Sequence, residues 1–189
     1  MDWEWAFDHP RARSWFDRPT VTVARALLGE WLVDRTPQGW RAGRIVETEA
    51  YVARDPASHA YRGPTARNRS MFDKPGTLYV YRIHQVHCAN LTTRPGQAVL
   101  LRAVEPITAN LGDPRGPGRL CRAFDLTREE DGISVVDGPR LRVLPGPTAR
   151  EPVISGPRVG IRRARSRRLR FALVRNRWVS YPRPPGWAG

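Results

Sequence analysis

The residues best suited to chemistry lie in residues 44–51 (RIVETEAY), a run that otherwise has the composition of a buried β-strand. Side chains alternate between the two faces of a strand, so Glu47, Glu49 and Tyr51 are expected to share one face. Carboxylates are rarely buried without a partner or a function. A carboxylate beside an aromatic ring on a rigid strand is suited to activating water next to a flat or cationic ligand.

Residues elsewhere in the chain could complete such a site. A carboxylate that takes a proton from water suits attack at the anomeric carbon of a sugar. Flat rings stack on bases and hold cationic ligands, and enzymes that act on a base within a duplex flip it into a pocket of this kind. These properties already place a base-excision enzyme among the leading hypotheses. Besides Glu49, its candidate site residues are Tyr51, His59, Tyr81, His84, Asn90 and Arg102.

The charge of the chain indicates a polyanionic partner. The net charge is +14 and the sequence pI is near 11.3, far more than solubility requires. No basic amphipathic helix is evident, which favours nucleic acid over a membrane surface. Nine arginines and no acid lie between residues 158 and 177, and we expect a phosphate-facing surface there. The candidates for DNA-backbone contact are Arg62, Arg67, Arg69, Arg163 and Arg165.

Several function classes are disfavoured. Cys88 and Cys121 stand alone and no metal-binding motif occurs, so we expect no metal and no cofactor. No apolar run approaches the ~20 residues of a transmembrane helix. The first residues lack the features of a secretory signal, so we expect a cytoplasmic, nucleoid-associated monomer. Lys74 is the only lysine, which leaves little scope for Schiff-base chemistry.

The local patterns predict a mixed α/β (α+β) fold: a single compact domain with a curved, mainly antiparallel sheet, short helices and no helix-hairpin-helix. Pro and Gly mark loops over 106–118 and 139–157. We expect residues 1–15 to be a loosely attached, mobile lead-in, 16–181 to form the domain and 182–189 to be a tail. The expected strands are 30–35, the return leg of a hairpin to residue 51, 76–81, 98–104 and 169–174, with helices at 23–28 and 119–124.

Four segments resemble the alkyladenine (3-methyladenine, methylpurine-type) DNA glycosylase family. They are residues 43–51 (GRIVETEAY), 67–72 (RNRSMF), 74–81 (KPGTLYVY) and 99–106 (VLLRAVEP), and weaker similarity extends from about residue 16 to residue 178. The resemblance implies monofunctional removal of alkylated or deaminated purines from double-stranded DNA.

The resemblance also implies roles for individual residues. Glu49 matches the general base that activates the attacking water, and Arg102 matches an arginine near that water and the DNA backbone. The flipped base would stack between Tyr51 and His59 on one side and Tyr81 on the other. Asn90 matches an asparagine that disfavours normal guanine.

The chain departs from the family in two places. His84 stands where family members commonly carry a tyrosine that intercalates into the gap left by the flipped base. Residues 79–90 are also one residue shorter than the usual pattern, near His87 and Cys88.

Two alternatives stay open from the residues alone. The first is a non-catalytic DNA-binding domain of the same fold, in which Glu47 and Glu49 are a strand pair neutralised by arginines. The second is an O-glycoside hydrolase that uses both carboxylates, which lie about 6.5–7 Å apart along a strand. The high pI suits neutral sugars poorly.

Overall fold

The structure of the chain is a computed structural model, which describes residues 2–147, 149 and 151–187. Strand β2 (Gly39–Tyr51) is its longest strand and organises the sheet. One edge of β2 pairs with β5 (Ala98–Pro106), while the other pairs first with β1 (Trp31–Thr36) and then, at Glu47–Glu49, with β8 (Arg170–Leu173). Register shifts follow Ile45 and Glu47. Because such irregularities bend and twist a strand, they contribute to the curl of the sheet.

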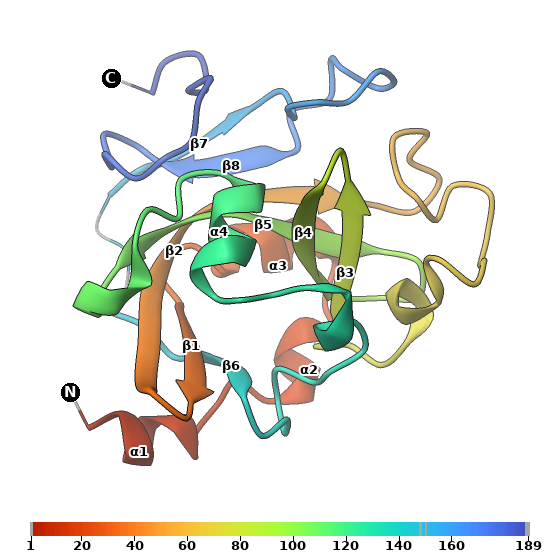
Figure 1. The fold of residues 1–189 in the computed structure, drawn as a ribbon. Coiled ribbons are helices and arrows are strands. Elements are labelled where there is room, and N and C mark those ends of the chain that lie inside the picture. Colours follow the sequence, from red (N-terminus) through yellow and green to blue (C-terminus); the bar gives the residue numbers. More distant parts are fainter. Residues whose placement is uncertain (1, 148, 150, 188–189) are drawn as a thin grey trace.

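The complete sheet is antiparallel and curled, as the sequence predicted (Figure 1). Its strand order is β3-β4-β5-β2-β1-β6, with β8 joined to β2 and β7 joined to β8. The remaining strands are β3 (Leu78–Ile83), β4 (Val86–Thr92), β6 (Leu141–Leu144) and β7 (Val153–Gly156).

Short helices cover the sheet on both sides, and the mixed α/β class is therefore confirmed (Figure 1). The hydroxyl of Thr48 on β2 donates to the carbonyl of Ala24 at 2.8 Å, which ties one helix to the centre of the sheet. The helices are α1 (Trp3–Phe7), α2 (Arg13–Phe16), α3 (Thr20–Ala26) and α4 (Pro117–Ala123), with 3-10 turns η1 (Arg69–Phe72), η2 (Ala109–Leu111) and η3 (Arg128–Glu130).

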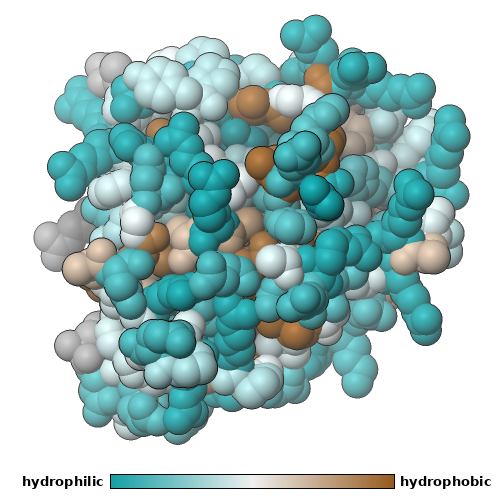
Figure 2. Space-filling model, viewed as in Figure 1, coloured by the Kyte–Doolittle hydropathy of each residue, from teal (hydrophilic) through white to brown (hydrophobic). Residues whose placement is uncertain are grey.

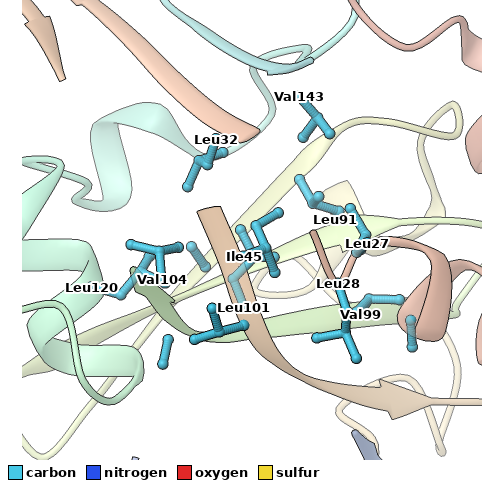
Figure 3. Packing of buried hydrophobic residues seen from close by; sticks show 14 of the residues in the cluster. Leu27, Leu28, Leu32, Ile45, Leu91, Val99, Leu101, Val104, Leu120 and Val143 are labelled. Carbon is cyan, nitrogen blue, oxygen red and sulfur yellow. The ribbon is translucent and has the colours of Figure 1, made fainter. Parts of the chain in front are cut away.

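The hydrophobic core makes this sheet a rigid platform. Leu32, Ile45 and Leu101 are fully buried and pack with side chains from α3 and α4 (Figure 3). Burial of each such side chain contributes about 1.5–3 kcal/mol. Polar groups on the central strands are therefore held by a well-packed framework.

The first fifteen residues were expected to be a loose lead-in, and the structure describes α1 and most of α2 within them. Phe7 is only 1% exposed and lies 5.2 Å from the ring of Trp40, centroid to centroid. At the other end, the Trp187 carbonyl accepts a hydrogen bond from the Arg175 N–H at 3.2 Å. The domain boundaries at residues 15/16 and 181/182 remain predictions.

Strands β4, β6 and β7 were not predicted. Strand β4 follows β3 through a two-residue turn, because Ile83 pairs with Val86. His84 and Gln85 both have positive φ, 44° and 67°, as a type I′ hairpin turn requires. Strands β6 and β7 lie in the Pro/Gly-rich segment 139–157, where the sequence predicted a loop.

Candidate active site

Glu47 is the structural member of the carboxylate pair. It is fully buried and accepts from the Nε atoms of Arg102 at 2.8 Å and Arg170 at 2.6 Å. It also accepts from the backbone N–H of Ser180 at 2.7 Å and from its hydroxyl at 3.1 Å. Three of these four donors fall on Oε1 and one on Oε2, so at most one lone-pair position of Glu47, on Oε2, is left for a substrate. The O-glycosidase hypothesis, which needs both carboxylates, loses support.

Glu49 is held differently. It is also fully buried, and its Oε1 accepts from the Val159 N–H at 2.8 Å and pairs with Arg102 Nη1 at 3.1 Å. Its Oε2 accepts from the Tyr51 hydroxyl at 3.0 Å. Burial and the charge of Glu49 raise the pKa of Tyr51 far above its usual value, so the hydroxyl stays protonated as a donor. Three fixed donors thus orient Glu49.

Arg102 bridges the two carboxylates and is 4% exposed. Burial disfavours its charge, but the carboxylates of Glu49 and Glu47 outweigh burial and raise its pKa. Its Nη2 donates to the Ser180 hydroxyl at 3.1 Å. The predicted shared face of Glu47, Glu49 and Tyr51 is consistent with these contacts, because Arg102 touches both carboxylates and Tyr51 bonds Glu49.

A cavity of about 760 Å³ lies against the residues that hold Glu49, although Glu49 itself is not among its lining residues. Tyr51, Arg102 and Val159, the three residues that contact the Glu49 carboxylate, line it, as do His59, Tyr81, His84 and Asn90. The structure therefore brings every pocket residue predicted from the sequence to one cavity. Its volume is in the range of small-molecule sites.

The aromatic wall of this cavity is built by His59, Tyr79 and Tyr81. The His59 and Tyr81 rings meet edge to face, with centroids 4.4 Å apart and planes at 72°. His59 Nδ1 lies 2.8 Å from the Tyr79 hydroxyl, which leaves Nε2 as the ring nitrogen for a ligand. Burial lowers the pKa of His59, so its imidazole is neutral at pH 7.

The β3–β4 hairpin carries both Asn90 and His84. Asn90 stands opposite Tyr79 in the ladder, and its amide donates to the Tyr79 carbonyl at 3.0 Å. His84 is at the tip, where Ile83 and Val86 are 46% and 37% exposed. A tight two-residue turn therefore presents His84, and an exposed apolar pair flanks it.

The arginine-rich rim differs in part from the expected surface. Arg62, Arg67, Arg69, Arg163 and Arg165 are exposed. Two members of the run of nine arginines are not, since Arg158 and Arg170 are 5% and 2% exposed and pair with Asp55 and Glu47. For these two, the prediction of a phosphate-facing surface is wrong. Figure 2 shows a mostly hydrophilic face with small hydrophobic groups among the polar side chains.

Sequence reasoning missed four residues that support the site: Asp55, Arg158, Val159 and Ser180. Val159 acts through its backbone N–H, which leaves no signal in side-chain identity. Ser180 acts through its N–H and its hydroxyl, but a lone serine near the C-terminus carries no distinguishing pattern. Within the described ranges, no group of three or more His, Cys, Asp or Glu could hold a metal ion. Over the same residues, no helix is both long and apolar enough to cross a membrane.

A buried carboxylate whose three donors line an aromatic cavity with a basic rim suits an enzyme that acts on bases in nucleic acid. The family model described as methylpurine-DNA glycosylase matches residues 14–177. Relatives named "Putative 3-methyladenine DNA glycosylase" include one from Anaeromyxobacter dehalogenans strain 2CP-1, 48% identical over 184 residues (93% of this chain, 87% of the relative). Another, from Methanoculleus marisnigri, is 43% identical over 186 residues (88% of this chain, 96% of the relative).

The chain therefore belongs to the methylpurine-DNA glycosylase family. The resemblance seen in the sequence is confirmed, and so is the class of enzyme: a DNA glycosylase, which hydrolyses N-glycosyl bonds in DNA repair.

Proposed function

We propose that this enzyme is a monofunctional glycosylase that flips alkylated or deaminated purines out of duplex DNA and hydrolyses the N-glycosidic bond with water activated by Glu49. The observation that carries the proposal is that the three donors to the Glu49 carboxylate, Tyr51, Arg102 and Val159, all line the aromatic cavity. A carboxylate so fixed can hold a water molecule in one place, which is the main requirement for attack.

In this mechanism the flipped purine stacks between Tyr51 and Tyr81. His59 was expected on the Tyr51 side, but its ring meets that of Tyr81 with centroids 4.4 Å apart, which leaves no room for a base between those two rings, so here it stands on the Tyr81 side. As the N-glycosidic bond breaks, its electron pair stays with the purine and the sugar gains positive charge. The Glu49 carboxylate stabilises that charge and takes a proton as the water oxygen bonds to the anomeric carbon. The products are the free purine and an abasic site. Alkylation at N3 or N7 gives the purine a positive charge, so such lesions leave without a strong acid.

The exposed arginines and the hairpin tip form the proposed DNA interface. Arg162 and Arg163 stand at the cavity, and Arg62, Arg67, Arg69 and Arg165 extend the basic surface. Phosphate contacts of this kind position a duplex without reading its sequence. His84 would enter the stack at the site of the flipped base. We propose a monomer that works in the cytoplasm at the nucleoid.

Single-turnover base release tests the proposal. Duplexes with one hypoxanthine, 1,N6-ethenoadenine or 7-methylguanine are incubated with excess wild type, Glu49→Gln or Glu105→Gln. Glu105, which lies on β5 and pairs with Arg44, is the matched control, and Glu105→Gln should release base at the wild-type rate. Glu49→Gln should bind the lesion and lose release by about 10²–10⁴-fold, the usual contribution of a general base.

The alternative is a non-catalytic DNA-binding domain. Tight binding to all duplexes without release from any would favour it. Retained release by Glu49→Gln would instead move the general base elsewhere.

The monofunctional part of the proposal has its own test. Lys74, the only lysine, is exposed and absent from the lining of the cavity, so no lysine amine stands ready to form a Schiff base. We expect no strand cleavage at the abasic product. A covalent DNA adduct trapped with borohydride would contradict this expectation.

A further inference from the structure

A buried ion pair lies beside the site and has no part in the mechanism above. Asp55 and Arg158 have fully buried side chains, and both Arg158 terminal nitrogens contact the carboxylate, with Nη2 3.0 Å from Oδ1. Arg158 Nη1 also donates to the Ala50 carbonyl at 3.0 Å. Because desolvation offsets most of the attraction within such a pair, a buried ion pair is weak grounds for a stabilising role alone.

Arg158 contacts one donor to Glu49 and is covalently joined to another. Its Cζ atom lies 4.6 Å from the centroid of the Tyr51 ring, whose hydroxyl donates to Glu49 Oε2. The next residue, Val159, donates its N–H to Oε1. Arg158 Nε is buried with no hydrogen-bond partner among the described residues, in keeping with a guanidinium held against the electron-rich face of the ring.

The pair also joins the two walls of the cavity. Asp55 directly precedes residues 56–59 and Arg158 directly precedes residues 159–163, and both stretches line the cavity. The two partners are 103 residues apart in the chain. Loss of the pair would therefore free both walls and both donors at once.

We propose that the Asp55–Arg158 pair is a positioning device for Glu49. It fixes the Tyr51 ring and the Val159 N–H so that the Glu49 carboxylate presents a defined lone pair to water. This inference rests on the proposed function of Glu49. Small displacements of a reacting group, about 1 Å, can cost about 10²-fold in rate, so the pair should act on the chemical step more than on lesion binding.

Asp55→Asn tests this, because it keeps the shape of Asp55 and removes its charge. We expect single-turnover release to fall by about 10–100-fold while the affinity for a lesion duplex changes less than about threefold. In a Tyr51→Phe background, Asp55→Asn should reduce the rate of single-turnover release by a clearly smaller factor than in wild type, because part of its effect passes through the Tyr51 hydroxyl. Arg158→Lys keeps the positive charge but loses the two-point contact with the carboxylate, so its release rate should lie between those of wild type and Arg158→Met. Arg158→Met should give the lowest release rate.

The matched control is Asp34→Asn. Asp34 is also fully buried and forms a forked pair with Arg140, at 2.8 and 3.2 Å, but it lies on β1 and does not line the cavity. We expect it to lower Tm without changing the rate per folded molecule. If Asp55→Asn behaves like this control and shows no coupling to Tyr51→Phe, the pair is only structural and the proposal is wrong.

Two further outcomes are separable. If Asp55→Asn does not fold, Arg158→Lys decides: a rate within twofold of wild type overturns the proposal, and a loss of about tenfold or more with unchanged lesion affinity supports it. If wild type releases no base from any lesion duplex, the proposed function fails first. The inference about Asp55 and Arg158, which rests on it, falls with it.

Discussion

Glu47 and Glu49 are separated by one residue, and we expect opposite consequences from the same substitution at each. Glu47→Gln should damage the fold, and Glu49→Gln should damage catalysis. The two carboxylates differ in the groups that they pair with and accept hydrogen bonds from. Glu47 neutralises Arg170 and shares Arg102 with Glu49, whereas the partners of Glu49 include two neutral donors at the cavity wall.

The magnitude for Glu47 follows from its contacts. Oε1 accepts from Arg102, Arg170 and the Ser180 hydroxyl, and Oε2 accepts from the Ser180 N–H. A glutamine in the same place sets an amide N–H against one of these donors and leaves Arg170 without a counter-charge. Removing one partner of a buried pair costs about 3–5 kcal/mol, a large share of the roughly 5–15 kcal/mol that stabilises a domain.

Glu49→Gln should cost less, about 1–3 kcal/mol, because Arg102 keeps Glu47 as its partner. Urea unfolding followed by tryptophan fluorescence measures both free energies, and thermal unfolding should show Tm about 6–20 °C lower for Glu47→Gln. Release per folded molecule should fall by less than about tenfold in Glu47→Gln. Equal stability losses in the two variants, or a greater loss of release in Glu47→Gln, would refute the division of roles.

Three further predictions concern the pocket and the rim. Burial lowers the pKa of His59 below 6.5, so as the pH falls the unfolded chain binds a proton at this residue before the folded chain does. The contribution of neutral His59 to the unfolding free energy is therefore complete above pH 6.5 and is lost as the pH falls toward the folded pKa. Between pH 8 and pH 5 the unfolding free energy should decline less in His59→Gln than in wild type. Replacing His84-Gln85 with Asn-Gly, the preferred type I′ pair, should raise Tm and yet lower base release, and a higher Tm with unchanged release would remove His84 from the intercalating role. Arg163→Ala and Arg165→Ala should each reduce the slope of log affinity against log salt by about 0.9, whereas Arg35→Ala, at the far end of β1 where Arg35 pairs with Glu4, should leave it unchanged.

The central strands were predictable because their patterns are local. Strand β2 combines alternation with length, and β5 is a nearly continuous apolar run. Strand β4 was missed because only Val86 and Thr92 of its seven residues are strong strand formers, and His84-Gln85 is not a recognised turn signal. Its structure comes from pairing with β3 on one side and β5 on the other, which is tertiary information.

The candidate pocket residues were largely predictable, but mainly through the family resemblance. Glu49, Tyr51 and Arg102 lie on the two best-predicted strands, so their meeting follows from the pairing of β2 with β5. Asp55 and Arg158 were not predictable, since an aspartate in a loop and one arginine among nine carry no distinguishing pattern. Burial alone separates Arg158 and Arg170 from their exposed neighbours.

Distant parts of the chain decide whether Glu47 or Glu49 could work as a general base. Alternation gives Glu47 and Glu49 the same face and nearly the same burial. Glu47 accepts a hydrogen bond from the N–H of Ser180, which is 133 residues away in the chain. Glu49 accepts one from the N–H of Val159, which is 110 residues away and lines the cavity. The chemistry of the motif therefore belongs to the loops around residues 159 and 180 as much as to the strand that carries the carboxylates.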